Sequence, residues 1–390
     1  MKYIYSNMSK TEIIGQGSYG CVYRPSIQCD GNIGSDTYIT KVQMTDEVTD
    51  NEKTIGKKIM KIAKYDKHFA PILESCKLNT SKLKREDLDK CELYDSDEET
   101  SFETNKIKYV GKNILTNGLY VLLNKYPKLF VRLLINTNID VLKSVHVLNS
   151  NNIIHMDLKQ DNVVLNDKGS GPIIIDFGLS FDTTKYIDED VFFTYGYDYA
   201  PWCFEITLLA YMINKKGEKW KRELVSEEDM KKVITDFVSY NKVFMDHKEL
   251  MRPLLNEFVA PFYEKTYELL YKECFNTVKT WDGYGVCVIY YRLLETFNLH
   301  GELSLKPYID ILKSVIFCNP KARVDAKEII IKIKTEFDME SIRASKKQIS
   351  KRISSMEKKR LEKMDKKIQQ EYVDELEQAK KYNEAQKRST

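Results

Sequence analysis

The sequence predicts a mixed α+β fold: a β-rich N-terminal part, a mainly helical part after it, and a charged helical tail. Glycine-punctuated, β-rich runs fill residues 1–45, whereas apolar residues recur at helical spacing from about residue 126. The last segment, 339–390, has no proline or glycine and is dense in Lys, Glu and Gln. We therefore divide the chain into residues 1–124, 125–338 and 339–390.

The N-terminal part is expected to be a sheet with one helix. The run EIIGQGSYGCVYRP predicts two strands around a glycine turn, and YITKVQM predicts a third strand. Residues 46–64 predict a helix, because Ile55 and Ile59 lie at helical spacing behind an acidic start. We expect two further strands at residues 109–110 and 119–123.

The middle part is predicted to alternate helices with short strands. Residues 133–150 predict one helix, and residues 163–165 and 173–175 predict strands. Residues 206–280 are predicted to be helical again, where Ser226 begins a capping box ahead of an amphipathic run.

Two segments are strongly charged. Residues 79–106 include DSDEETSFET and are predicted to form a solvated acidic loop. The tail, 339–390, has more basic than acidic residues, and its apolar residues keep near-heptad spacing only at its start. A long exposed helix or weak coiled coil fits this tail, and so does a solvated tail without a partner.

Composition argues against several classes of protein. A formal net charge of +3 over 390 residues disfavours a nucleic-acid or membrane-surface coat. No apolar run approaches the roughly 20 residues of a membrane span, and the N-terminus lacks the apolar stretch of a signal peptide. The eight cysteines form no C-x-x-C pair, which argues against a zinc ribbon and a secreted disulfide framework. We therefore expect a soluble, intracellular, cytoplasmic protein in a reducing compartment.

A glycine-rich run near the N-terminus is the first candidate site. Glycines let the backbone approach phosphate oxygens and turn its N–H groups toward them. Alone the pattern is weak, since a glycine-rich hairpin without a ligand explains it equally well. Its place between two strands, rather than between a strand and a helix, disfavours a Rossmann site. The candidate nucleotide-binding residues are Gly15, Gln16, Gly17, Ser18, Tyr19, Gly20 and Val22.

Lys41, on the next predicted strand, is a candidate for phosphate binding. A lysine there can hold the α- and β-phosphates of a nucleotide if a carboxylate fixes its position. Glu52 is the first candidate for that carboxylate, because the isoleucines of its helix turn the same face toward the sheet; Glu47 is the second. Taken alone, Lys41 is more readily explained as an ordinary surface lysine of a strand.

The residues with the clearest chemistry follow the long predicted helix, in HMDLKQDN at 155–162 and DFG at 176–178. Phosphoryl transfer needs a carboxylate that accepts and orients a hydroxyl, and oxygen ligands for the magnesium that bridges the phosphates. Asp157, Asn162 and Asp176 have the right chemistry for these roles. Each of them alone would usually be a turn or capping residue, but together they indicate phosphoryl transfer.

Taken together, these motifs resemble the eukaryotic-type protein kinase family, in the family's order and over residues 11–335. The resemblance implies a bilobal kinase-like fold with a β-rich N-lobe, a helical C-lobe and, appended to them, the charged tail. It also implies ATP and Mg²⁺ as cofactors, with Mn²⁺ as an alternative ion. The site residues that it implies are, as catalytic residues, Asp157 (the base), Lys159, Lys41 and Glu52, and, as metal ligands, Asn162 and Asp176.

Later segments extend the resemblance. Lys159 is similar to the lysine of serine/threonine kinases, which implies serine or threonine as the acceptor, with dual specificity as the alternative. Residues 200–201 with Glu205 resemble the family's APE motif, residues 282–290 resemble its αF helix, and Arg323 would pair with Glu205. The background, rich in Lys, Asn, Ile and Tyr, is similar to kinases of large DNA viruses, which would place the protein in host cytoplasm or virion.

Three departures from the family limit what the resemblance implies. Met156 replaces the arginine that normally meets an activation-loop phosphate, so we predict no strict dependence on phosphorylation of Thr183, Thr184 or Thr194. The helical insertion before the αF-like segment is interpreted as padding rather than a docking surface. Ile39 stands where many members have a small alanine above the adenine, and it narrows the expected pocket.

The sequence supports an active kinase over two alternatives. A pseudokinase or scaffold would bind nucleotide and partners without efficient transfer, but such proteins usually lose one of the residues retained here as Lys41, Asp157 and Asp176. A tail that binds nucleic acid is disfavoured, because it mixes both charge signs and lacks interleaved aromatics. The expected partners are protein substrates and a helical or acidic partner for the tail, with no membrane.

Overall fold

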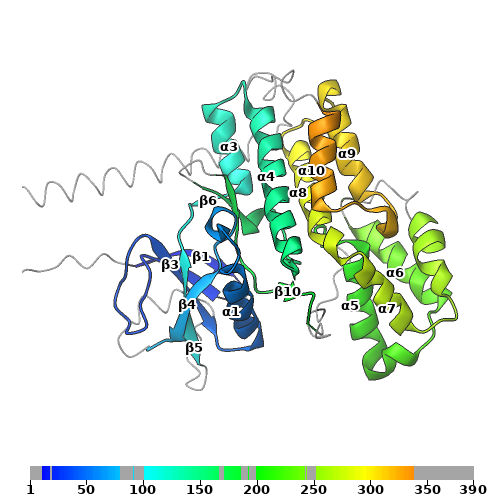
Figure 1. The fold of residues 1–390 in the computed structure, drawn as a ribbon, viewed down its shortest axis with the longest axis horizontal. Coiled ribbons are helices and arrows are strands. Elements are labelled where there is room, and N and C mark those ends of the chain that lie inside the picture. The colour runs from blue at the N-terminus through cyan, green and yellow to red at the C-terminus, as the bar shows by residue number, and fades with distance from the viewer. Residues whose placement is uncertain are drawn as a thin grey trace, which may run out of the picture.

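The computed structural model describes a mixed α+β structure. In Figure 1 the five-stranded sheet and helix α1 (Glu47–Ile59) lie on one side, and the other helices lie on the opposite side. Among the described residues, no helix is long and apolar enough to cross a membrane. The predicted charged tail, 339–390, lies outside the residues that the structure describes. The structure describes residues 11–17, 20–79, 91, 101–166, 171–185, 192, 199–241, 243 and 252–337.

The main sheet is antiparallel, with strand order β1-β2-β3-β5-β4. The first three strands and α1 lie where the sequence predicted them. Strand β4 was not predicted, although it forms an edge of the sheet. The strands are β1 (Glu12–Gly17), β2 (Gly20–Arg24), β3 (Tyr38–Met44), β4 (Ile72–Lys77) and β5 (Phe102–Lys108).

The prediction of a solvated loop over residues 79–106 is wrong for its last residues, which begin β5 in the interior of the sheet. The polar side chains that suggested solvent exposure are buried because they have partners. The Glu103 carboxylate accepts from Lys53 Nζ at 2.8 Å, and Asn105 Nδ2 donates to Gln43 Oε1 at 2.9 Å. Most of the remaining segment lies outside the described residues.

The strand predicted at residues 119–123 is also wrong, because this segment belongs to helix α3 (Leu115–Lys125). Leu115, Leu119 and Leu123 recur every four residues and are buried together. A short apolar run is ambiguous between strand and helix, and here the longer periodicity decides. Residues 109–110 follow β5 rather than forming a strand of their own.

The helical part packs around α4 and α8. All thirteen buried residues of α8 contribute to this interior, and α4 begins three residues before its predicted start. The predicted N-cap is confirmed: Ser226 Oγ accepts from the Asp229 N–H at 3.3 Å. The helices are α4 (Phe130–Ser150), α5 (Phe204–Lys216), α6 (Glu227–Tyr240), α7 (Tyr267–Asn276), α8 (Trp281–Thr296), α9 (Lys306–Ile316), α10 (Ala326–Glu336) and the π-helical η7 (Pro253–Val259).

Short strands connect the sheet to the helices. Two of them, at residues 163–165 and 172–174, lie where they were predicted. They form a three-stranded sheet of order β6-β8-β9, and a separate pair joins β7 to β10. The strands are β6 (Asn113–Ile114), β7 (Ile153–Ile154), β8 (Val163–Leu165), β9 (Pro172–Ile174) and β10 (Phe181–Asp182).

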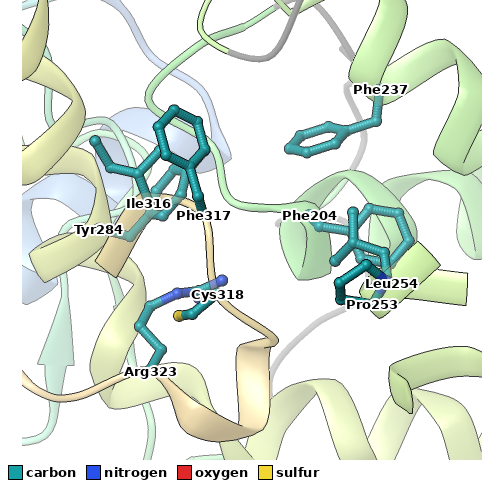
Figure 2. A pocket seen from close by; sticks show the side chains of 9 residues that line it. All are labelled: Phe204, Phe237, Pro253, Leu254, Tyr284, Ile316, Phe317, Cys318 and Arg323. Atoms are coloured by element: carbon teal, nitrogen blue, oxygen red, sulfur yellow. The ribbon is translucent and has the colours of Figure 1, made fainter. Parts of the chain in front are cut away.

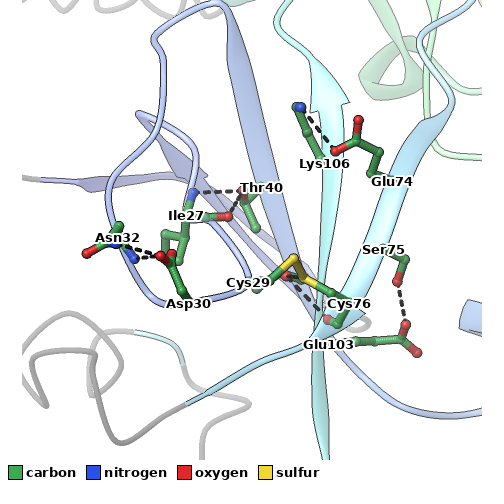
Figure 3. Close-up of a disulfide and its surroundings, with 11 residues drawn as sticks. Ile27, Cys29, Asp30, Asn32, Thr40, Glu74, Ser75, Cys76, Glu103 and Lys106 are labelled. Atoms are coloured by element: carbon green, nitrogen blue, oxygen red, sulfur yellow. Dashed lines mark hydrogen bonds and ion pairs between the residues drawn. A yellow bond between two sulfur atoms is a disulfide. The ribbon is translucent and has the colours of Figure 1, made fainter.

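Two disulfides cross-link the sheet part, so the expectation of reduced cysteines is wrong for four of the eight. Cys21 pairs with Cys91, and Figure 3 shows Cys29 of the loop after β2 bonded to Cys76 of β4. The partners lie 70 and 47 residues apart, and cysteine spacing along the chain does not encode pairs that tertiary folding brings together. Because such bonds persist mainly in oxidising environments, they are in tension with the predicted reducing compartment.

The predicted pair of Arg323 with Glu205 is confirmed inside the helical part. Arg323 Nη1 donates to Glu205 Oε1 at 2.7 Å and Nη2 donates to Oε2 at 3.0 Å. Figure 2 shows Arg323 across a small cavity from Phe204 and Leu254. This cavity has a volume of about 10 Å³, far below the several hundred Å³, roughly, of a ligand pocket.

Candidate active site

Lys41 of β3 lies between two carboxylates from different parts of the chain. Its Nζ donates to Glu52 Oε2 of α1 at 3.1 Å and to Asp176 Oδ1 at 3.1 Å. The expected pairing with Glu52, rather than with Glu47, is therefore present. The side chain of Lys41 is 12% exposed, whereas that of Asp176 is 38% exposed. The cluster thus has a buried side at Glu52 and an open side at Asp176.

The electrostatics of the cluster keep both partners charged. Burial by itself lowers the pKa of Lys41, but the Glu52 and Asp176 carboxylates outweigh burial and raise it. Burial by itself raises the pKa of Asp176, and the Lys41 ammonium, with smaller contributions from His155 and Lys159, outweighs this and lowers it. The aspartate is therefore held as an anion at the open side of the cluster, where it can serve as an oxygen ligand.

Asp157 lies in the loop after β7 and is bound by its own loop. Its Oδ2 accepts from Lys159 Nζ at 2.8 Å and from Asn162 Nδ2 at 2.9 Å. The same amide nitrogen also donates to the Asp157 backbone carbonyl at 2.8 Å. Its Oδ1 accepts a short hydrogen bond from the Tyr199 hydroxyl. Three candidate residues, Asp157, Lys159 and Asn162, are thus brought into direct contact.

Helix α8 holds this loop in place through one buried carboxylate. Asp282 Oδ2 accepts from the His155 N–H at 2.8 Å, and Oδ1 accepts from the Met156 N–H at 3.0 Å. Met156 has φ of +65°, a left-handed conformation that costs free energy for a side chain with a Cβ. The two hydrogen bonds that Asp282 accepts from these N–H groups hold the backbone in that conformation, directly before Asp157.

Asn162 and Asp176 are joined through Ile175. Asn162 lies at the end of a short 3₁₀ turn, Gln160–Asn162, and its carbonyl accepts from the Ile175 N–H at 3.0 Å. The Ile175 carbonyl in turn lies 3.0 Å from His155 Nε2. Because the Asp157 N–H donates to His155 Nδ1 at 3.3 Å, Nε2 is the ring nitrogen that donates to the Ile175 carbonyl. The two predicted metal ligands therefore lie at the ends of adjacent antiparallel strands.

Helix α1 is attached to the segment that follows Asp176. Asn51 Nδ2 donates to the carbonyls of Gly178 at 3.3 Å and Ser180 at 2.8 Å. Phe177 is buried and makes an edge contact with Phe69, with ring centroids 6.1 Å apart. These contacts couple the position of Glu52, on the same helix, to the position of Asp176.

The glycine-rich hairpin of β1 and β2 pairs with β3, the strand that carries Lys41. Val22 lies opposite Lys41 in the β2–β3 ladder, and Gly15 lies opposite Val22 in the β1–β2 ladder. A Cβ on Gly20 would come within 2.6 Å of the Val42 carbonyl, so packing alone requires glycine there. Gln16 and Gly17 belong to β1, and residues 18–19 lie outside the described residues.

Two of the predicted site residues fit a magnesium ion. Because the amide nitrogen of Asn162 is bound to Asp157, the side chain offers its oxygen as a ligand, as does the ionised Asp176. Carboxylate and amide oxygens are ligands that Mg²⁺ accepts, usually together with phosphate oxygens and water. In the described part of the chain no group of three or more His, Cys, Asp or Glu could hold a metal by itself. Two protein oxygens would leave the other positions around such an ion to phosphate oxygens and water.

Three side chains at this site were not predicted from the sequence. Gln43 Nε2 donates to Glu52 Oε2 at 3.2 Å, and its position two residues after Lys41 on one strand face could have indicated this. Asn51 and Tyr199 carried no comparable signal, because their partners are distant in sequence. No protein-family model matches the chain, and no curated protein matches it.

Proposed function

We propose that the chain is a protein kinase of the eukaryotic type that transfers the γ-phosphoryl group of ATP, with Mg²⁺, to serine or threonine hydroxyls of proteins. The observation that carries the proposal is the connected series Glu52–Lys41–Asp176 and Asp157–Asn162, drawn from the sheet, α1 and two loops. Such a group supplies, in one place, a base, a phosphate-binding cation and two oxygen ligands.

The chain's own residues would do the following work. Lys41 would contact the α- and β-phosphates while Glu52 keeps its ammonium in place, and Asn162 with Asp176 would hold the metal. Bound Mg–ATP supplies the phosphoryl group and neutralises its charge. Asp157 would orient the acceptor hydroxyl and accept its proton at Oδ1, the oxygen that receives no hydrogen bond from its own loop.

Serine or threonine specificity is part of the proposal and depends on Lys159. Its ammonium lies 2.8 Å from Asp157 Oδ2, adjacent to the oxygen that would receive the substrate proton. A cation at this place can stabilise negative charge that develops on the transferred group. The bilobal kinase-like arrangement is likewise proposed, supported by the position of these groups between the sheet part and the helical part.

Radiolabelled ATP tests the proposal directly. We expect wild type to label a generic protein substrate on serine or threonine, and Asp157→Asn to lower turnover by about 10² to 10⁴-fold, the range for loss of a general base. ATP affinity should be preserved. Asp161→Asn is the matched control, since Asp161 is exposed on the same loop. Equal turnover in wild type and Asp157→Asn, or acceptor sites on other residue types, would contradict the proposal.

One observation favours a second candidate, a nucleotide-binding scaffold. Both oxygens of Asp157 already accept hydrogen bonds, Oδ1 from Tyr199 and Oδ2 from Lys159 and Asn162. A scaffold would bind ATP measurably yet transfer no phosphate to itself or to generic substrates. The same labelling experiment, combined with an ATP-binding measurement, separates the two.

A further inference from the structure

The Tyr199 hydroxyl occupies the one oxygen of Asp157 that its own loop leaves open. The loop itself supplies the donors to Oδ2, namely Lys159 and Asn162, whereas Oδ1 is reached from a distant segment. Tyr199 stands directly before the Ala200-Pro201 pair, 42 residues after Asp157. A phenol that donates to Oδ1 makes the same hydrogen bond that an acceptor hydroxyl would make in the proposed reaction.

The tyrosine is positioned for this contact by its surroundings. Its ring packs edge-on against Trp202, with centroids 5.0 Å apart, and Trp202 Nε1 donates to the Met156 carbonyl at 2.9 Å. Tyr199 is therefore anchored to the backbone that immediately precedes Asp157. Burial, followed by the charge of Asp157, raises the pKa of Tyr199, so its hydroxyl remains a protonated donor at neutral pH.

We propose that Tyr199 is an internal plug that holds the acceptor position on Asp157 and must leave before a protein substrate can bind productively. The inference rests on the proposed kinase function. A serine or threonine of the substrate would replace the phenol on Oδ1, so substrate and plug compete for one oxygen. Nucleotide binding is not in this competition, because Lys41 and Asp176 lie outside the Tyr199 contact.

The competition makes a quantitative prediction. When only a fraction of molecules is competent, the apparent affinity for substrate falls by that fraction. A hydrogen bond to a charged group is strong enough to reduce the competent fraction about tenfold. Removing the hydroxyl while keeping the ring should therefore tighten substrate binding and leave the chemical step unchanged.

Tyr199→Phe tests the plug through steady-state kinetics. We expect the KM for a protein substrate to fall about tenfold, with kcat within about twofold of wild type and the Kd for ATP unchanged. Tyr308→Phe is the matched control, because Tyr308 of α9 is buried and its hydroxyl has no partner among the described residues. An unchanged KM, or a fall in kcat, in Tyr199→Phe would overturn the proposal.

A second measurement does not depend on activity. Nitration by tetranitromethane, mapped by mass spectrometry, should spare Tyr199 relative to Tyr126, which is 43% exposed, and Asp157→Ala should make Tyr199 reactive. If wild type and Tyr199→Phe are both inactive but this protection is found, the occupied carboxylate is supported and the kinase function fails. Rapid nitration of Tyr199 in wild type overturns the plug, and so does phosphate on Tyr199 after incubation with Mg–ATP, which would make it an acceptor.

Discussion

The molecule contains two clusters of paired charges, one in the helical part and one at the sheet, that differ in how far they are buried. Arg323 and Glu205 form a bidentate pair whose side chains are 2% and 0% exposed. Lys41 divides its ammonium between Glu52, which is buried, and Asp176, which is 38% exposed. Each cluster joins residues that are far apart in sequence, so each ties the fold together. They differ in exposure: the first pair is enclosed by protein, whereas one carboxylate of the second is open to solvent.

The difference separates a structural cluster from a cluster that can receive a ligand. In the first, both oxygens of Glu205 face the guanidinium, and Oε1 also accepts from the Thr277 hydroxyl at 2.7 Å. In the second, the lysine contacts a single oxygen of each acid, and one acid faces solvent. A buried, closed pair is sensitive to loss of one partner, whereas an open cluster can lose one charge at lower cost in stability. Substitutions in the Arg323–Glu205 pair should therefore mainly lower stability, and substitutions in the Lys41 cluster should mainly lower activity.

The largest effect is expected from breaking the closed pair. Arg323→Met leaves the Glu205 carboxylate buried without its cation and should lower the free energy of unfolding by about 3–5 kcal/mol. Urea denaturation monitored by circular dichroism measures this change. A double variant, Glu205→Leu with Arg323→Met, removes the orphaned charge and should recover part of the loss. A single-variant loss below about 1 kcal/mol, the value of a surface pair, would remove the distinction between the clusters.

Lys41→Met should show the reverse pattern. In the proposed kinase it removes the phosphate-binding cation, and we expect phosphotransfer to fall about 10²-fold, as when a single charge-stabilising donor is lost. The free energy of unfolding should change less than in Arg323→Met, because the Lys41 site opens toward solvent at Asp176. Lys106→Met is the matched control, since Lys106 pairs with Glu74 on the sheet surface and lies outside the site. Unfolding of Lys41→Met, rather than loss of transfer, would contradict a binding role.

Asp176→Asn should have a smaller effect, confined to the metal and nucleotide. An amide keeps an oxygen ligand but loses the charge, so we expect the KM for ATP to rise about tenfold, with partial recovery at raised Mg²⁺. Kinetics at several magnesium concentrations measure both quantities. If the substitution instead lowers kcat at saturating ATP and magnesium without changing the KM, Asp176 has a role other than ligand binding.

The site was more predictable from sequence than the sheet that carries it. The Lys41–Glu52 pair was predicted from the strand and helix patterns, and the Arg323–Glu205 pair from the resemblance of their segments to the kinase family. Strand β4 and the disulfide partners were not predicted, since strand order and long-range cross-links depend on tertiary contacts. Residues 103–105 were misassigned for a related reason: their polarity indicated solvent, and only the fold reveals the partners that allow their burial.

Tyr199 marks the limit of prediction at the site itself. Nothing in its local sequence distinguishes it from the other tyrosines, and its role follows only from the Oδ1 contact across 42 residues. Asp282 was placed correctly on its helix, but the hydrogen bonds that it accepts from two backbone N–H groups were not predicted. Motifs predicted which residues gather, whereas the hydrogen bonds that orient them required the structure.

The smallest effect on activity is expected from removing phosphate from the segment after Asp176. In the proposed kinase, Met156 stands where a phosphate-binding arginine would be expected, and its side chain is buried in the apolar interior of the helical part. A thioether offers no cation for a phosphate, so phosphatase treatment should change phosphotransfer by less than about twofold. A variant with both Thr183→Ala and Thr184→Ala is a separate check on the two described threonines. Thr194 lies outside the described residues. A large loss of activity in both experiments would mean that another cation reads the phosphate, and that the open cluster around Lys41 is regulated from the segment after Asp176.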